Sequence, residues 1–444
     1  MKRNLYIILC LISLFMLLIC LFFRCTYYSF NSNKVKETAT YLSSDDFKGR
    51  LPGSLENEQI SEEIATTFHN LNLKPLSDNY NEQFTVTAPI YNGNNPSLKI
   101  LDKDNSVVKE FVLGKDFKED FINFKSNSIQ FSKENSVHIY EKSIIICKDN
   151  RLYLFYVTFD KNFNFRSSFI NDSQFDFAIQ ITTDTFNSIL DSIRNGYMLD
   201  VQLPYDLKAV NVYNVCGMIQ GTSELPPLII TAHFDHLGYD SLKRTYCGAL
   251  DNASGTAFML ELCKTFSSLK LPKRDIIFVA LNCEEFGLLG SNEFAKEYQD
   301  KLQDSTVINF DMIGASNTPI TLMSGANSFK TSSNLLNDLT SICIDKNLDY
   351  KISYEDASDH ASFINSGFDS LTICHAYTTS IHTPRDTSEK LCASSIDDVY
   401  SLIYPEIIDT CYSDKLLILY DRKTLIFFSI TTATLGIFLI KMPR

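Results

Sequence analysis

The second half of the chain alternates between short apolar runs and segments whose apolar residues recur at helical spacing. The runs predict buried strands, and the segments between them predict helices. In chain order, strands and helices are expected alternately at residues 225–234, 253–269, 274–282, 288–298, 305–314 and 333–347. This alternation predicts an α/β fold over residues 206–412, a three-layer αβα sandwich with a mostly parallel central sheet.

Residues 91–205 follow a different pattern. Short β-type runs, for example at residues 97–101, 143–147 and 151–159, are separated by turns rich in Asn, Asp and Lys. We therefore expect an inserted, mainly β module that interrupts the α/β domain.

The segment before this module, residues 37–90, reads as the first part of the α/β domain. Its apolar residues recur at helical spacing between Ile60 and Leu71, which predicts a helix packed on a later core. A polar linker is expected at residues 31–36.

The N-terminal residues 1–30 predict a membrane anchor. Residues 5–23 form an apolar run of nineteen residues, which is long enough to span a bilayer. The alternative is a cleaved signal peptide, but the run exceeds the apolar h-region of an ordinary signal peptide, and bulky residues follow it. An uncleaved signal anchor with Lys2 and Arg3 in the cytoplasm is therefore favoured.

A second apolar run lies near the C-terminus. Residues 425–440 are flanked by basic residues and predict a transmembrane helix at about residues 424–440; a helix packed on the domain or lying in the membrane interface is the alternative. Two spans would place the body outside the cytoplasm, in a periplasmic, extracellular or lumenal space.

Charge and cysteine content exclude some functions. The formal net charge is −13, and Lys and Arg form no cluster that could bind phosphates, so nucleic acid is not expected as a partner. The twelve cysteines include no Cys-x-x-Cys pair, which argues against a zinc ribbon or a redox motif.

Acidic residues follow three of the expected strands. Asp235, the pair Glu284 and Glu285, and Asp311 come where an apolar run ends, and His233 lies beside the first of them. Carboxylates at such places are costly unless a cation compensates them, and the carboxyl ends of parallel strands share one edge. Histidines and carboxylates without paired cysteines suit a hydrolytic zinc site, which two ions could share.

Six ordered motifs carry a family resemblance: HFDH, GALDNASG, CEEFGLLGS, NFDMIG, SDHASF and IHTPRDT. Together they resemble the di-zinc aminopeptidases of metallopeptidase family twenty-eight, which include bacterial leucine aminopeptidases, aminopeptidase Y and glutamate carboxypeptidase. The resemblance covers about residues 37–90 and 206–400, and it implies a zinc exopeptidase-like fold.

The resemblance also implies a role for each site residue. Two zinc ions would be the cofactors, one bound by His233 and Asp311 and the other by Glu285 and His382, with Asp251 bridging both. Glu284 would be the general base, and Asp235 would hydrogen-bond His233 and fix its tautomer.

The function implied is a zinc-dependent exopeptidase, an aminopeptidase that acts on peptides with a free N-terminus through a hydroxide bridging two zinc ions. The alternatives are N-terminal cyclisation like that of glutaminyl cyclases and an inactive receptor or scaffold on the same fold. His236 and His360 are expected not to bind metal. Some relatives have an oxyanion-stabilising tyrosine where this chain has Ile381, and Tyr377 is the candidate replacement.

Overall fold

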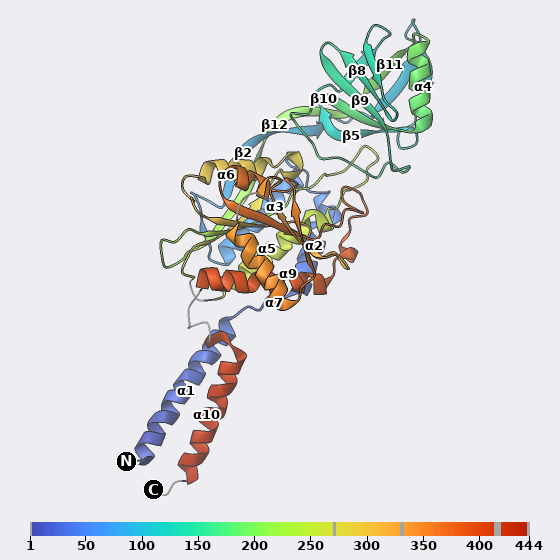
Figure 1. Cartoon of the computed structure of the whole chain (residues 1–444). Helices are drawn as coiled ribbons and strands as arrows, with labels where there is room; N and C mark the ends of the chain where they lie inside the picture. The colour runs from blue at the N-terminus through green and yellow to red at the C-terminus, as the bar shows by residue number, and fades with distance from the viewer. Residues whose placement is uncertain (1, 270–271, 329–332, 413–418, 442–444) are drawn as a thin grey trace.

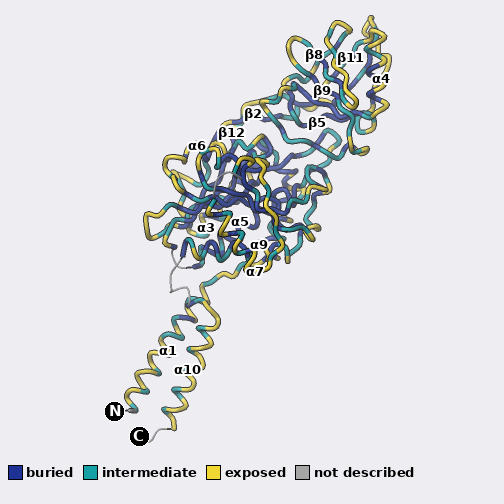
Figure 2. Tube along the Cα trace, in the orientation of Figure 1, coloured by how far each residue is buried: buried dark blue, intermediate teal, exposed yellow. Residues whose placement is uncertain are grey.

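The computed structural model describes residues 2–269, 272–328, 333–412 and 419–441. Three parts follow one another along an elongated molecule: two terminal helices, an α/β body, and a β-rich unit at the far end (Figure 1). Buried residues are concentrated in the body and the β-rich unit, whereas the terminal helices are mostly exposed (Figure 2).

The body is built on a nine-stranded mixed sheet. In sheet order its strands are β1 (Lys74–Pro75), β12 (Tyr205–Ile219), β14 (Ile276–Leu281), β13 (Leu228–His233), β15 (Thr306–Phe310), β18 (Asp369–Cys374), β16 (Ile320–Ser324) and β17 (Tyr350–Tyr354). The ninth strand, β2 (Asn81–Tyr91), pairs with β12. The four central strands β14, β13, β15 and β18 are parallel, and antiparallel pairs lie outside them. The expected α/β class with a mostly parallel central sheet is confirmed.

Helices contact both faces of this sheet. Side chains alternate along a strand, so Ile230 belongs to one core and its neighbour Ile229 to the other. The first core includes residues of α2, α3, α5, α7 and α9, at Ser32–Leu42, Leu55–Asn70, Gly255–Ser267, Asn334–Lys346 and Ala393–Ile407. The second includes residues of α6 and α8, at Leu289–Tyr298 and His360–Asn365.

Residues 97–202 form the β-rich unit, which contains two further sheets. The five-stranded sheet runs β5, β10, β9, β8 and β7, at Phe117–Phe124, Phe175–Ile181, Arg151–Val157, Ser143–Lys148 and Ser136–Ile139. The four-stranded sheet runs β4, β3, β11 and β6, at Val107–Glu110, Ser97–Leu101, Met198–Gln202 and Ser128–Phe131. The sequence did not predict the helix α4 (Thr183–Arg194) within this unit.

The terminal helices α1 (Lys2–Thr26) and α10 (Arg422–Lys441) lie side by side (Figure 1). Ser13 Oγ lies 2.8 Å from Thr432 Oγ1, and the ring of Tyr6 lies beside that of Phe438. Because the earlier residue of α1 contacts the later residue of α10, the two helices are antiparallel. Both helices are long and apolar enough to cross a membrane, and both chain ends lie at the same end of the pair.

The expected polar linker at residues 31–36 is wrong, because helix α2 begins at Ser32. Asn31 caps this helix by accepting the backbone N–H groups of Asn33 and Lys34, and Val35 and Ala39 are fully buried. The polar residues at the start of this segment belong to an amphipathic helix, and its apolar face packs on α5 and α9. The helix expected between Ile60 and Leu71 is confirmed as α3.

Candidate metal centre

The residues expected to form the site meet at the carboxyl edge of the central strands. His233 ends β13, Glu284 and Glu285 lie on the short helix η3 (Glu284–Phe286) after β14, and Asp311 follows β15. His382 lies in the loop that follows β18. Because these strands are parallel, their ends converge on one edge although the residues span 150 positions of sequence.

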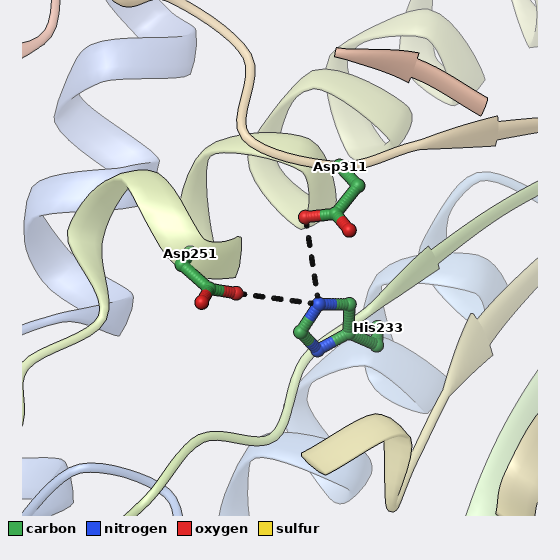
Figure 3. A group of neighbouring side chains, drawn as sticks. All are labelled: His233, Asp251 and Asp311. Carbon is green, nitrogen blue, oxygen red and sulfur yellow. Dashed lines mark ion pairs between the residues drawn. The ribbon is translucent and has the colours of Figure 1, made fainter. Parts of the chain in front are cut away.

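The first cluster joins His233, Asp251 and Asp311 (Figure 3). His233 Nε2 lies 3.5 Å from Asp251 Oδ1 and 3.6 Å from Asp311 Oδ1. All three side chains are buried. Neither His233 Nε2 nor Asp311 Oδ1 has a hydrogen-bond partner within the described part of the chain.

A second cluster uses the other oxygen of Asp251. His382 Nε2 lies 3.4 Å from Asp251 Oδ2 and 3.3 Å from Glu285 Oε2. The Asp251 carboxylate therefore faces one histidine and one carboxylate on each side.

Both clusters fit a cation. Zinc ligands lie about 2.0–2.2 Å from the ion, so two ligands of a tetrahedral site are about 3.3–3.6 Å apart. The distances of 3.3–3.6 Å between ligand atoms match this spacing. In the first cluster, His233 Nε2 and Asp311 Oδ1 are buried without hydrogen-bond partners among the described residues, which a cation would compensate.

The loop that carries Asp251 is fixed by its neighbours. Asp386 accepts the backbone N–H groups of Leu250 and Asp251 at 2.9 and 3.0 Å. Gly248 has φ = +56°, and a Cβ there would lie 2.2 Å from the carbonyl oxygen of Asp251 and 2.5 Å from the His236 ring. Only glycine fits this turn without displacing the cluster. Asp386 could not be predicted from the sequence, because its role depends on a contact 135 positions away.

Asp235 contacts the site differently from the expectation. Its Oδ1 lies 3.6 Å from His233 Nδ1, which is beyond hydrogen-bond distance. Its two oxygens instead accept the backbone N–H groups of Glu284 and Glu285, at 3.1 and 3.2 Å. Asp235 thus faces the imidazole and also holds the start of η3.

Glu284 and Glu285 have opposite electrostatic environments. Burial raises the pKa of Glu284 well above its ordinary value, and the carboxylates of Glu285, Asp359 and Asp311 raise it further. Burial acts in the same direction on Glu285, but His382 and His236 outweigh it and hold the pKa of that carboxyl well below its ordinary value. Of the pair, Glu285 belongs to the second cluster, whereas Glu284 lines the adjoining cavity.

His236 is closer to the site than expected. Its Nδ1 lies 2.7 Å from Glu285 Oε1, and His236, Asp251 and Glu285 each offer a ligand atom within 4.8 Å of the others. Its position follows from the HFDH turn, in which Phe234 packs into the core and His236 returns to the edge.

Two other buried histidines, His360 and His375, are bonded elsewhere. His360 lies between the carbonyl oxygen of Glu355 and the hydroxyl of Thr372, at 2.9 and 2.8 Å. The Nδ1 atom of His375 accepts the backbone N–H of Gly314 at 3.0 Å. These contacts leave both rings in structural roles.

A cavity of about 280 Å³ adjoins both clusters. Its wall combines site residues such as Glu284 with the apolar side chains of Met312, Met323 and Ile381, and Lys351 and Glu355 also line it. Tyr377 is not among the described residues lining this cavity; it packs against the main core.

Buried histidines and carboxylates lie at the carboxyl ends of the parallel central strands. This arrangement is typical of the active sites of metal-dependent hydrolases. Residues 214–407 match the model of Peptidase family M28, so the expected resemblance to this family is confirmed.

Two relatives and one solved structure illustrate the similarity. Aminopeptidase NAALADL1 of Rattus norvegicus is 38% identical over 133 residues, 28% of this chain and 17% of its own length. Aminopeptidase YwaD of Bacillus subtilis is 26% identical over 199 residues, 42% of this chain and 41% of its own length. The chain thus covers less than half of each of these relatives. The structure of BSAP, a zinc aminopeptidase from Bacillus subtilis, superposes with a TM-score of 0.60 at 15% identity over 87% of this chain and 97% of that one, and it supports the fold.

Proposed function

We propose that the protein is a membrane-anchored, zinc-dependent aminopeptidase that removes N-terminal residues from peptides. The observation that carries the proposal is the Asp251 carboxylate, whose two oxygens face two separate pairs of metal-ligand side chains beside a cavity. The match of residues 214–407 to the model of a peptidase family supports the same activity.

In this proposal two ions share the site. His233 and Asp311 would hold one ion, His382 and Glu285 would hold the other, and Asp251 would contribute one oxygen to each. When bound, zinc lowers the pKa of water and polarises a carbonyl group, which is the chemistry that peptide hydrolysis requires.

Glu284 is the proposed general base. Its carboxylate lines the cavity beside the proposed metal ligands, where it would take a proton from water and then give it to the leaving amine. Asp235 positions Glu284, because it accepts the backbone N–H of that residue.

The size and lining of the cavity favour an exopeptidase. A volume of about 280 Å³ lies at the small end of ligand pockets and takes one residue of a peptide. Met312, Met323 and Ile381 give the cavity an apolar wall, so we expect it to accept an apolar side chain.

The terminal helices would hold the body at a membrane surface. Their antiparallel pairing places both chain ends on one side and the body on the other. With Lys2, Arg3 and Lys441 on the cytoplasmic side, the catalytic body would be extracytoplasmic.

The decisive experiment compares Glu284→Gln with the wild-type chain and with Glu293→Gln, a control at an exposed position on α6. Each protein is given an aminoacyl arylamide, its N-acetylated form and a peptide that begins with glutamine. We expect wild type and Glu293→Gln to hydrolyse only substrates with a free N-terminus. Glu284→Gln should lose roughly 10²–10⁴-fold in kcat while keeping its zinc.

Four outcomes would contradict the proposal. Cyclisation of the glutamine peptide without hydrolysis would indicate a glutaminyl cyclase-like enzyme. Release of C-terminal residues from N-acetylated peptides would indicate a carboxypeptidase. Hydrolysis unaffected by Glu284→Gln would exclude Glu284 as the general base. A purified chain that binds no zinc would indicate a receptor or scaffold.

A further inference from the structure

One loop of the β-rich unit reaches the candidate metal centre. Residues 158–174 connect β9 to β10, and we call them the crossing loop. The backbone N–H of Arg166 donates to the carbonyl oxygen of His382 at 3.0 Å, and that of Phe169 donates to the carbonyl oxygen of Glu285 at 2.9 Å. The loop is therefore bonded to the main chain of two proposed metal ligands.

Side chains of the crossing loop also contact these ligands. Ser168 Oγ donates a hydrogen bond of 2.7 Å to Glu285 Oε2, while Glu285 Oε1 lies 2.7 Å from His236 Nδ1. The Phe165 ring stacks on His382, with centroids 6.1 Å apart and an angle of 24° between the planes. Ser168 thus gives one oxygen of the Glu285 carboxylate a hydrogen bond, and His236 lies beside the other oxygen.

Buried cations hold the crossing loop in place. Lys118 on β5 is fully buried and donates to the carbonyl oxygens of Phe163 and Phe165 at 3.0 and 2.9 Å. It also pairs with Asp240 of the α/β body at 3.4 Å. From the body, Arg244 donates to the same Phe163 carbonyl at 2.6 Å. A displaced loop would leave the buried ammonium of Lys118 without its two carbonyl acceptors, so this arrangement is strongly favoured.

Arg166 adds a second attachment. Its guanidinium lies 3.7 Å from the centroid of the Phe121 ring and donates to the carbonyl oxygen of Tyr239. The loop is consequently bonded on one side to the β-rich unit and on the other to the body.

We propose that Ser168 is a positioning residue of the metal centre, supplied by the β-rich unit, and that its hydroxyl orients Glu285 for binding the second ion. The inference rests on the proposed function, because it takes Glu285 as a zinc ligand. Hydrogen-bond partners that orient a metal ligand typically change metal affinity by roughly 10–100-fold when they are removed.

The neighbouring Ser167 provides a matched control. Its Oγ is buried and has no hydrogen-bond partner among the residues that the structure describes. Ser167→Ala and Ser168→Ala therefore delete the same atom one position apart, but only the second deletion removes the bond to Glu285.

The test measures zinc bound per full-length chain in detergent at increasing chelator concentration. For Ser168→Ala we expect the more weakly held zinc to be lost at a chelator concentration roughly ten-fold lower than in wild type. Ser167→Ala should match wild type, and Ser168→Thr, which keeps the hydroxyl, should restore retention. Equal zinc retention in Ser168→Ala and Ser167→Ala would overturn the proposal.

Two further measurements keep the test decisive. If Ser168→Ala does not fold, Ser168→Thr and Ser168→Val are compared, because they have nearly the same volume and differ in the hydroxyl; equal zinc retention by this pair would also overturn the proposal. Hydrolysis is assayed separately with the Glu284→Gln variant. Weaker zinc binding in Ser168→Ala together with no aminopeptidase activity in wild type would support the positioning role and refute the proposed function.

Discussion

Replacing Arg50 by Met should destabilise the loops on both sides of the metal centre. Arg50 is 1% exposed, and its guanidinium donates to four backbone carbonyl oxygens. The acceptors belong to Phe234, Leu42, Cys247 and Gly248, at 2.7, 2.9, 2.6 and 2.8 Å. The first acceptor follows His233, and the last two precede the turn that carries Asp251.

The size of the effect follows from these four bonds. A buried acceptor left without its donor costs roughly 1–3 kcal/mol. Burial also lowers the pKa of Arg50, so removing the charge returns part of its desolvation energy. We therefore expect the low end of the range, a loss of about 4 kcal/mol in the free energy of unfolding.

Urea unfolding followed by circular dichroism suits this measurement, because the chain contains no tryptophan for fluorescence. Arg50→Lys keeps the charge but has one nitrogen, so it should fall between wild type and Arg50→Met. Arg194→Met removes an exposed guanidinium and should leave stability unchanged. A loss below about 1 kcal/mol for Arg50→Met, comparable to one net hydrogen bond, would refute the reasoning.

Two further predictions concern pH and metal. Burial lowers the pKa of His375 to about 4. As pH falls below about 6.5 the unfolded chain takes up the proton first, so stability is lost progressively between pH 6.5 and 4, by up to about 3 kcal/mol. His375→Asn, which keeps an acceptor for the Gly314 N–H, should flatten this dependence in urea titrations, and an unchanged slope would contradict the assignment. Removing metal with a chelator should lower the unfolding midpoint and adding zinc should restore it, because zinc at 100 times its Kd stabilises by about 2.7 kcal/mol; a midpoint insensitive to zinc would argue against a metal site.

The central sheet could be predicted because its strands are buried on both faces. Such strands are continuous apolar runs, as in β13 and β14. The helices between them are distinguished by apolar residues that recur at helical spacing. The antiparallel pairing of β16 with β18 could not be predicted, because strand order and direction depend on contacts between distant segments. Helix α2 was missed for a related reason, since Val35 and Ala39 become an apolar face only where α5 and α9 pack on them.

The site residues divide in the same way. Glu284 and Asp311 were found because a carboxylate directly after a buried strand is conspicuous in sequence. Arg50, Asp386 and Ser168 were not found, because nothing in their own neighbourhood distinguishes an arginine, aspartate or serine that bonds a loop more than a hundred positions away.

The contribution of Ser168 follows from a strand direction that the sequence does not reveal. The apolar runs of the β-rich unit predict strands, and adjacent runs would ordinarily be joined as hairpins. In the structure β9 and β10 pair in parallel, so the chain between them must return along the length of the sheet. The crossing loop is this returning segment. Its seventeen residues are long enough to reach Glu285 in the α/β body. The parallel pair therefore explains why the β-rich unit provides a long connection here, and the buried contacts of Lys118 explain why that connection ends against the metal centre.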